Sequence, residues 1–189
     1  MIALINQKVW IIFFAIIFML QNLAFAQDQN ARIANMTVTN TRDHLLLYLN
    51  IEGAFRDDTK KAILNGVPAT FTFFTSLYQI KNFWFDNKIA DITITHAIKY
   101  DSLKKEFIIT RSSVSESGEH LVTKSFDEAQ KLMTQVDGLK IVPLDKLKKG
   151  GKYQIRAKAE RGKLTLPFYL HYVSLKDFET DWHTTDFSY

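Results

Sequence analysis

The sequence predicts an α+β fold that is mainly antiparallel β, with β-sandwich-like sheets and two short helices. Several segments alternate apolar and polar residues with a period of two, which is typical of strands that bury one face. Turn-forming residues separate many of these segments, as in antiparallel hairpins. The chain has 189 residues, and its 15 Phe, 7 Tyr and 3 Trp residues can supply a large apolar core. Only 7 Gly and 3 Pro residues argue against a disordered chain.

The first two predicted strands form a hairpin. Residues 32–40 alternate between apolar and polar side chains. The predicted inward face carries Ala34, Met36 and Val38. Residues 41–44 supply the turn, and residues 45–51 form a strand with apolar side chains on both faces. Such a strand is typical of the middle of a covered sheet.

A short helix is predicted over residues 58–65. Asp57 or Asp58 is its predicted N-cap, because a short acidic side chain can accept a hydrogen bond from the first free N–H groups. Gly66 lies where a left-handed C-cap is expected, and Pro68 follows it closely.

A second helix is predicted to begin with a capping box. Ser125 and Glu128 have the spacing of that motif, and Gly138 is the predicted end of the helix. Apolar residues at helical spacing are Ala129, Leu132, Met133 and Val136.

The rest of the chain is predicted to be strands and loops. Residues 152–160 alternate most clearly, which places the side chains of Tyr153, Ile155, Ala157 and Ala159 inward. The other predicted strands are residues 67–81, 92–100, 106–111, 120–124, 166–173 and 182–189.

The N-terminal segment 1–26 has the pattern of a secretory signal peptide. Lys8 precedes an apolar run over residues 9–20, and small residues occur at Ala24 and Ala26. We therefore expect cleavage between Ala26 and Gln27. The alternative is an uncleaved membrane anchor, but the run of 12 residues is shorter than the about 20 that span a bilayer.

The signal segment predicts a periplasmic protein in which residues 27–189 form a single exported β-rich domain. The chain has no Cys, so a lipoprotein anchor, disulfides and thiol chemistry are excluded. The formal net charge of +4 is mild, which argues against nucleic acid as a partner and allows at most peripheral membrane contact. We expect no cofactor, because the common nucleotide-binding motifs and the local zinc spacings are missing from the sequence.

The sequence contains no motif that defines a reaction. It lacks the G-x-S-x-G nucleophile elbow, so catalytic residues are not predicted. His96 falls on the apolar face of its strand, where a hydrogen-bonded core histidine is commoner than a catalytic one. Acidic residues and one histidine alternate near the C-terminus, where a solvated face is the favoured interpretation and a cation site the alternative. These residues are Asp177, Glu179, Asp181 and His183.

Two further clusters are candidate contact surfaces. Alternation places Phe71 and Phe73 inward and Phe74 on the opposite face, while Phe83, Trp84 and Phe85 cannot all point to one side of a strand. At least one of the last three is therefore predicted to be half-exposed or to cover a sheet edge. Core packing is the favoured interpretation of these rings, and a surface for a partner or an apolar ligand is the alternative that makes them the candidate binding residues. A basic turn around Gly150 and Gly151 is either a solvated turn or a contact for lipid head groups. Its lysines are Lys146, Lys148, Lys149 and Lys152.

Several motifs along the chain resemble those of one protein family. They comprise A-x-x-x-G-V-P at 62–68, F-W-F-D at 83–86 with I-A at 89–90, Y-D-S-L at 100–103, S-F-x-E-A at 125–129, Y-Q-I-R at 153–156, L-P at 166–167 and D-W at 181–182. In this order they resemble an exported proteobacterial family of unknown function, numbered forty-three-ninety in the domain-of-unknown-function series. Phe at both 83 and 85 departs from the Trp usual at one of these positions, and residues 157–160 lack the family's second Arg and Leu-Asp. The resemblance implies an exported single-domain bacterial protein and brings no activity or site residues.

Three functions remain open from the sequence. The favoured one is a non-enzymatic envelope module that binds an envelope or inner-membrane protein through a strand edge and the aromatic residues 83–85. The second is a carrier or sensor of an apolar small ligand held between sheet and helix. The third is a periplasmic enzyme whose site is assembled by folding near His96 or residues 177–183.

Overall fold

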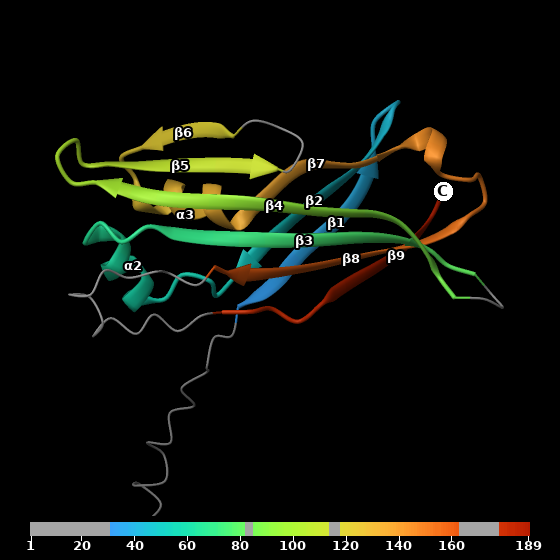
Figure 1. Ribbon diagram of the computed structural model, residues 1–189, viewed down its shortest axis with the longest axis horizontal. Coiled ribbons are helices and arrows are strands. Elements are labelled where there is room, and N and C mark those ends of the chain that lie inside the picture. The colour runs from blue at the N-terminus through green and yellow to red at the C-terminus, as the bar shows by residue number, and fades with distance from the viewer. Residues whose placement is uncertain (1–30, 82–84, 114–117, 163–177) are drawn as a thin grey trace, which may run out of the picture.

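The computed structural model describes residues 31–81, 85–113, 118–162 and 178–189. It confirms the predicted α+β fold with mainly antiparallel β structure: two sheets cross one another, with two short helices at one end (Figure 1). The signal segment 1–26 and the predicted strand 166–173 lie outside the described residues.

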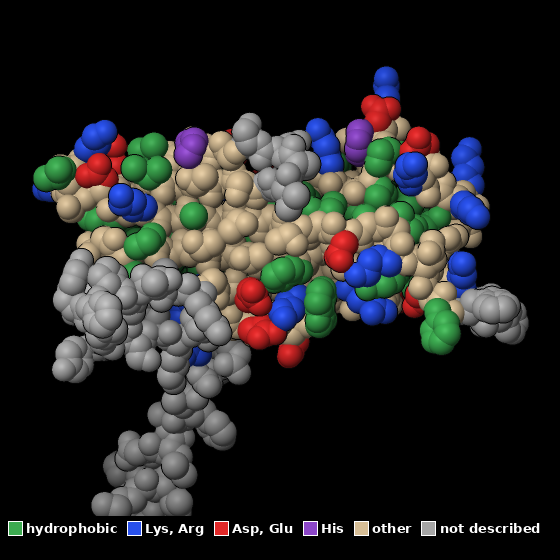
Figure 2. Space-filling view, viewed as in Figure 1, with side chains coloured by type: hydrophobic (Ala, Val, Ile, Leu, Met, Phe, Trp, Pro, Cys, Tyr) green, Lys and Arg blue, Asp and Glu red, His purple; other side chains and the backbone are tan. Residues whose placement is uncertain are grey.

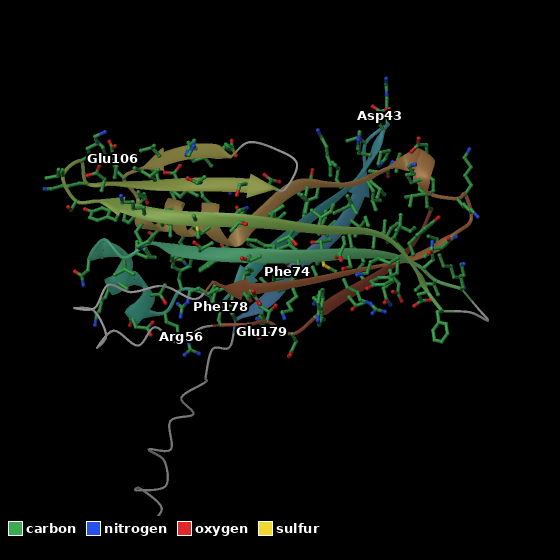
Figure 3. The ribbon with its side chains drawn as sticks, in the orientation of Figure 1. Asp43, Arg56, Phe74, Glu106, Phe178 and Glu179 are labelled. Carbon is green, nitrogen blue, oxygen red and sulfur yellow. The ribbon has the colours of Figure 1, made fainter. Side chains whose placement is uncertain are left out.

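The larger sheet has six strands in the order β6-β5-β4-β3-β8-β9, and every neighbouring pair is antiparallel. Its strands are β3 (Ala69–Gln79), β4 (Asn87–Asp101), β5 (Glu106–Ser113), β6 (Glu119–Thr123), β8 (Lys152–Arg161) and β9 (His183–Ser188). The alternation predicted for β8 is confirmed, because Tyr153, Ile155, Ala157 and Ala159 are all buried. The predicted facing on β3 is confirmed as well: Phe71 and Phe73 are buried, whereas Phe74 lies half-buried on the outward face (Figure 3).

The smaller sheet has three strands in the order β1-β2-β7. They are β1 (Arg32–Asn40), β2 (His44–Glu52) and β7 (Gln135–Pro143). The central strand β2 buries Leu45, Leu47, Leu49 and Ile51. Its central position matches the apolar character of both faces in the sequence.

The predicted inward face of β1 is only partly correct. Ile33 is buried and Ala34 is not, whereas Met36 and Val38 do pack against the core. The pairing of β1 with β2 shifts register between Ala34 and Thr37, and Asn35 has a positive φ of 53°. A bulge of this kind inserts a residue and moves the inward face from odd to even positions.

Helix α2 (Asp57–Leu64) begins after Arg56, so the prediction that Asp57 or Asp58 is the N-cap is wrong. Both aspartates lie in the first turn, where negative charge stabilises the helix dipole. Gly66 has a φ of +84°, which confirms its place in the left-handed C-terminal turn. Leu64, the last residue of α2, is 40% exposed.

Helix α3 (Phe126–Thr134) begins as predicted, because the Ser125 hydroxyl accepts a hydrogen bond from the Glu128 N–H at 3.3 Å. The helix ends at Thr134 rather than at Gly138. Gln135 is already extended, and Val136 pairs with Leu49 of β2 as part of β7. Pairing of this segment with β2 stabilises the strand more than the helical spacing of Val136 stabilises a longer helix. The helix therefore leads directly into β7.

The helices and an aromatic cluster fill one end of the space between the sheets. Phe126 of α3 contacts Phe55 and Phe107 with ring centroids 5.8 and 5.6 Å apart. Phe71 contacts Phe55 and Phe178 at 5.1 and 4.9 Å. These rings belong to one hydrophobic core that also includes the buried side chains of β2 in the smaller sheet.

Candidate binding groove

A groove of about 410 Å³ lies between β7 of the smaller sheet and β4 and β5 of the larger one. In Figure 1, β7 runs at an angle to β4 and the two strands separate beyond the end of α3. The groove is lined by Ile92, Ile94, His96, Arg111, Ser112, Glu119 and residues 135–141. We call this feature the β7 groove.

One wall of the β7 groove is the backbone of an edge strand. β7 pairs with β2 on one side, and no strand within the described residues pairs with its other side. The unpaired N–H and C=O groups of such an edge can accept another extended chain. Register shifts interrupt the pairing with β2, and Gly138 has a φ of +70°. This positive φ favours glycine at position 138, where an added Cβ would lie 3.4 Å from the Tyr48 hydroxyl.

The floor of the groove is apolar and its rim is charged. Ile94 and Ile141 are buried, while Ile92 is only half-buried and so presents apolar surface to an occupant. The charged residues around this floor carry both signs: Arg111, Glu119, Asp137 and Lys140. An apolar floor beneath a mixed polar rim is typical of a binding surface for peptides.

His96 is a structural residue within the groove wall. Its side chain is only 3% exposed, its ring lies 4.8 Å from the Phe73 ring, and Nδ1 is 3.1 Å from the Met133 carbonyl oxygen. The pKa of His96 is lowered to about 4, mainly by burial; the hydrogen bond with Met133 opposes this lowering, and the charge of Arg111 adds to it. The neutral ring therefore donates its Nδ1–H to the last turn of α3 and ties that helix to β4.

Arg111 fixes the same helix end from β5. Its Nε and Nη2 donate to the Leu132 carbonyl oxygen at 3.1 and 2.7 Å. Glu119 lies opposite Arg111 on β6. The free carbonyls at the end of a helix need such donors, so Arg111 and His96 together stabilise the abrupt change from α3 to β7.

The groove does contain His96 together with the carboxylates of Glu119 and Asp137, the combination that a fold-assembled enzyme would need. However, His96 is buried and neutral, Nδ1 is committed to a carbonyl, and none of the causes of its pKa shift is a carboxylate. This arrangement suits a structural role for His96 in the groove wall better than a role as a catalytic acid or base.

The structure separates the predicted aromatic surface from the groove. Phe85 lies in the connection between β3 and β4 and is 97% exposed. Phe83 and Trp84 lie outside the described residues. Phe85 therefore belongs to a hairpin tip, whereas the groove begins further along β4 at Ile92.

The acidic stretch near the C-terminus does not form one strand face. Glu179 makes an isolated bridge to Glu160 and an ion pair with Lys158, and β9 begins only at His183. Figure 3 shows Glu179 at the margin of the larger sheet. Asp177 lies outside the described residues, within which no cluster of three or more potential metal ligands occurs.

The turn around Gly150 and Gly151 has the geometry expected of its glycines. Gly150 has a φ of +73°, and a side chain at Gly151 would lie 2.8 Å from the Tyr153 ring. The Tyr153 hydroxyl accepts a hydrogen bond from the Lys148 N–H at 2.6 Å. This bond connects the turn to β8, and the lysine side chains of the turn are exposed.

Sequence reasoning missed two features of the surface. The edge position of β7 was hidden because its first residues continue the helical spacing of α3. The second feature is a network on the outward face of β8, where Arg156 lies 4.6 Å from the Tyr78 ring and bonds Gln154, which in turn bonds Asp186. Its signal was the row of polar residues at alternate positions of β8.

The family of this protein follows from a match to a family model. The model described as Domain of unknown function (DUF4390) matches residues 28–186, so the chain belongs to this family. This confirms the resemblance seen in the sequence. No curated protein and no solved structure gave a significant match to the chain. Neither helix in the described part of the chain has the length and hydrophobicity needed to cross a bilayer.

Proposed function

We propose that this protein is an exported, periplasmic, non-enzymatic module that binds an extended segment of an envelope or inner-membrane protein. The observation that carries the proposal is the edge of β7 beside the β7 groove. Addition of a strand to such an edge is a common mode of peptide recognition, since the main-chain hydrogen bonds do not depend on the partner's sequence.

The side chains around the edge indicate which segment would fit. A strand added to β7 would direct every second side chain toward Ile92 and the other apolar residues of the floor. The intervening side chains would point away from this floor. The preferred partner is therefore a segment that alternates apolar and polar residues, with charges of either sign accommodated by Arg111, Lys140, Glu119 and Asp137.

Export is part of the proposal and rests on the N-terminal sequence. Cleavage after Ala26 would leave Gln27 as the first residue of the mature protein. Mass spectrometry of protein recovered from the periplasm would test this directly. A mature N-terminus at Gln27 is the expected result, and recovery of the intact chain in the cytoplasm would contradict the proposal.

Peptide selection would test the recognition mode. Random twelve-residue peptides selected on the folded protein should alternate apolar and polar residues. In nuclear magnetic resonance titrations, the largest shifts should occur at the β7 amides and around Ile92. Selected peptides without alternation, or shifts centred on the outward face of the larger sheet, would refute strand addition at β7.

A matched pair of variants would distinguish a loss of binding in the groove from a general effect of replacing a half-buried isoleucine. Ile92 on the groove floor and Ile108 on the outward face of β5 are both half-buried. Ile92→Ser should weaken the selected peptide roughly tenfold, because each buried methylene contributes about 0.8 kcal/mol. Ile108→Ser should leave affinity unchanged, and equal losses from the two substitutions would argue against the groove.

An apolar small ligand is the alternative occupant, favoured by the isoleucine floor of the same groove. Native mass spectrometry of the exported protein would distinguish the two. A bound lipid-sized mass that leaves after Ile92→Ser would support a carrier, whereas a protein without added mass supports the peptide-binding proposal.

A further inference from the structure

Two segments that are distant in the sequence meet at one end of the larger sheet. One is the tip of the β3–β4 hairpin, and the other is the connection from β7 to β8, which contains the 3-10 turn η1 (Leu144–Lys146). Gln79 pairs with Tyr153, and the Ile80 N–H donates to the Lys152 carbonyl at 2.9 Å. We call these segments, residues 79–81, 85–88 and 144–152, the basic end.

The basic end carries a strong local excess of positive charge. It contains six lysines and two aspartates, for a formal charge of +4 that equals the net charge of the whole chain. The lysines, all exposed, are Lys81, Lys88, Lys146, Lys148, Lys149 and Lys152. Figure 2 shows Lys and Arg side chains grouped on this end. Lys88 also pairs with Asp91 at 2.9 Å, so the β7–β8 turn provides most of the unneutralised charge.

An aromatic side chain projects from the same end. Phe85 is 97% exposed at the hairpin tip, beyond the last paired residues of β3 and β4. A large aromatic side chain gains free energy when it leaves water, and lysines around it are attracted to anionic head groups. The exposed aromatic side chain and the exposed lysines therefore lie at the same end of the larger sheet.

We propose that the basic end docks the protein on an anionic lipid surface, with Phe85 inserted among the head groups. Charge complementarity favours lipid, because the exposed lysines and Phe85 lie at the same end of the larger sheet, where anionic head groups could contact the lysines while Phe85 inserts. Phe85 also stands on a projecting tip rather than in a concave pocket, which suits a fluid surface better than a shaped protein partner. This surface is distinct from the β7 groove, so the two proposals can fail independently.

The absence of cysteine from the sequence allows one probe to be placed at each end of the sheet. Phe85→Cys would carry an environment-sensitive nitrobenzoxadiazole label at the basic end. Leu103→Cys provides a matched control, because Leu103 is 94% exposed at the tip of the β4–β5 hairpin. The exported protein would be mixed with phosphatidylcholine vesicles, with or without about 30% phosphatidylglycerol.

The label at position 85 should shift to the blue and brighten with the anionic vesicles, while the label at position 103 should not change. Lys146→Gln, Lys148→Gln and Lys149→Gln combined should weaken vesicle binding roughly a hundredfold, since each lysine near an anionic surface contributes about a fivefold factor. Circular dichroism would verify that this variant is folded.

Four outcomes would contradict the proposal, the first three of them as a whole. The first is no response at position 85 with either vesicle, and the second is an equal response at position 103. The third is a response at position 85 only when a purified envelope protein is added, which would assign the basic end to a protein partner. A position-85 response that is unaffected by the three lysine substitutions would also contradict the electrostatic part.

Discussion

Protonation of His96 should make this protein sensitive to mild acid. The pKa of His96 is lowered from 6.5 to about 4 in the folded protein, mainly by burial. Above pH 6.5 the ring is neutral in both the folded and unfolded states, so its contribution to stability is constant. Below pH 6.5 the unfolded chain takes up a proton that the folded protein excludes, so the free energy of unfolding falls until the pH reaches about 4.

The size of this effect follows from the two pKa values. Each unit of pKa difference corresponds to about 1.4 kcal/mol, so a difference of about 2.5 units gives a total loss of about 3 kcal/mol. Most of this loss should already have occurred by pH 4.5, because that pH lies close to the pKa of the folded protein. A loss of that size is a large fraction of the about 5–15 kcal/mol that stabilises a typical domain.

Urea unfolding at pH 7.5 and pH 4.5, followed by circular dichroism at constant ionic strength, would measure the effect. His96→Asn keeps a donor near the Met133 carbonyl and cannot be protonated in this range. The substitution should lower the free energy of unfolding at pH 7.5, because the contact with Phe73 is lost. This loss is the same at both pH values, so it cancels when the two free energies of unfolding are subtracted. His120→Asn is the matched control, because His120 is exposed and bonds only the Thr110 hydroxyl within the described residues.

The reasoning would be refuted if His96→Asn retained the pH dependence of the natural protein. It would also be refuted if His120→Asn removed as much of that dependence as His96→Asn. Either result would mean that other groups are responsible for the acid sensitivity.

Three further substitutions test the packing and the cap in thermal and urea unfolding. Phe71 is fully buried between Phe55 and Phe178, so Phe71→Ala should lower the free energy of unfolding by about 3–5 kcal/mol; a loss near zero would contradict the described core. Phe85→Ala should change stability by less than about 0.5 kcal/mol, because the side chain is exposed. Ser125→Ala should cost about 1 kcal/mol through loss of the cap on α3, and no change would show that the cap bond is unimportant.

The strands were predictable where a single period continues along the segment. Residues 152–160 alternate without interruption, and the structure buries the predicted face of β8. The strands predicted at residues 92–100 and 106–111 correspond to β4 and β5, which pair with one another as an antiparallel hairpin. In these segments, local pattern and tertiary packing agree.

The predictions failed where tertiary contacts override the local pattern. The bulge at Asn35 exchanges the inward positions of β1, and no side-chain period reveals an inserted residue. The helical spacing after Ser125 continues to Val136, yet pairing with β2 converts the last part into β7. The β7 groove depends on the angle between two sheets, so its residues are brought together only by folding.

Site-specific photocrosslinking in cells would test the central claim of strand addition at β7 most directly. A photoreactive amino acid would replace Asp137 or Lys140, two exposed residues of β7, with Thr95 on the outward face of β4 as control. Strand addition predicts attachment to one extended segment of one envelope protein, with the attached residue moving by about three positions between the two sites. Attachment points scattered over unrelated segments, or the same attachment from Thr95, would contradict recognition through the edge of β7.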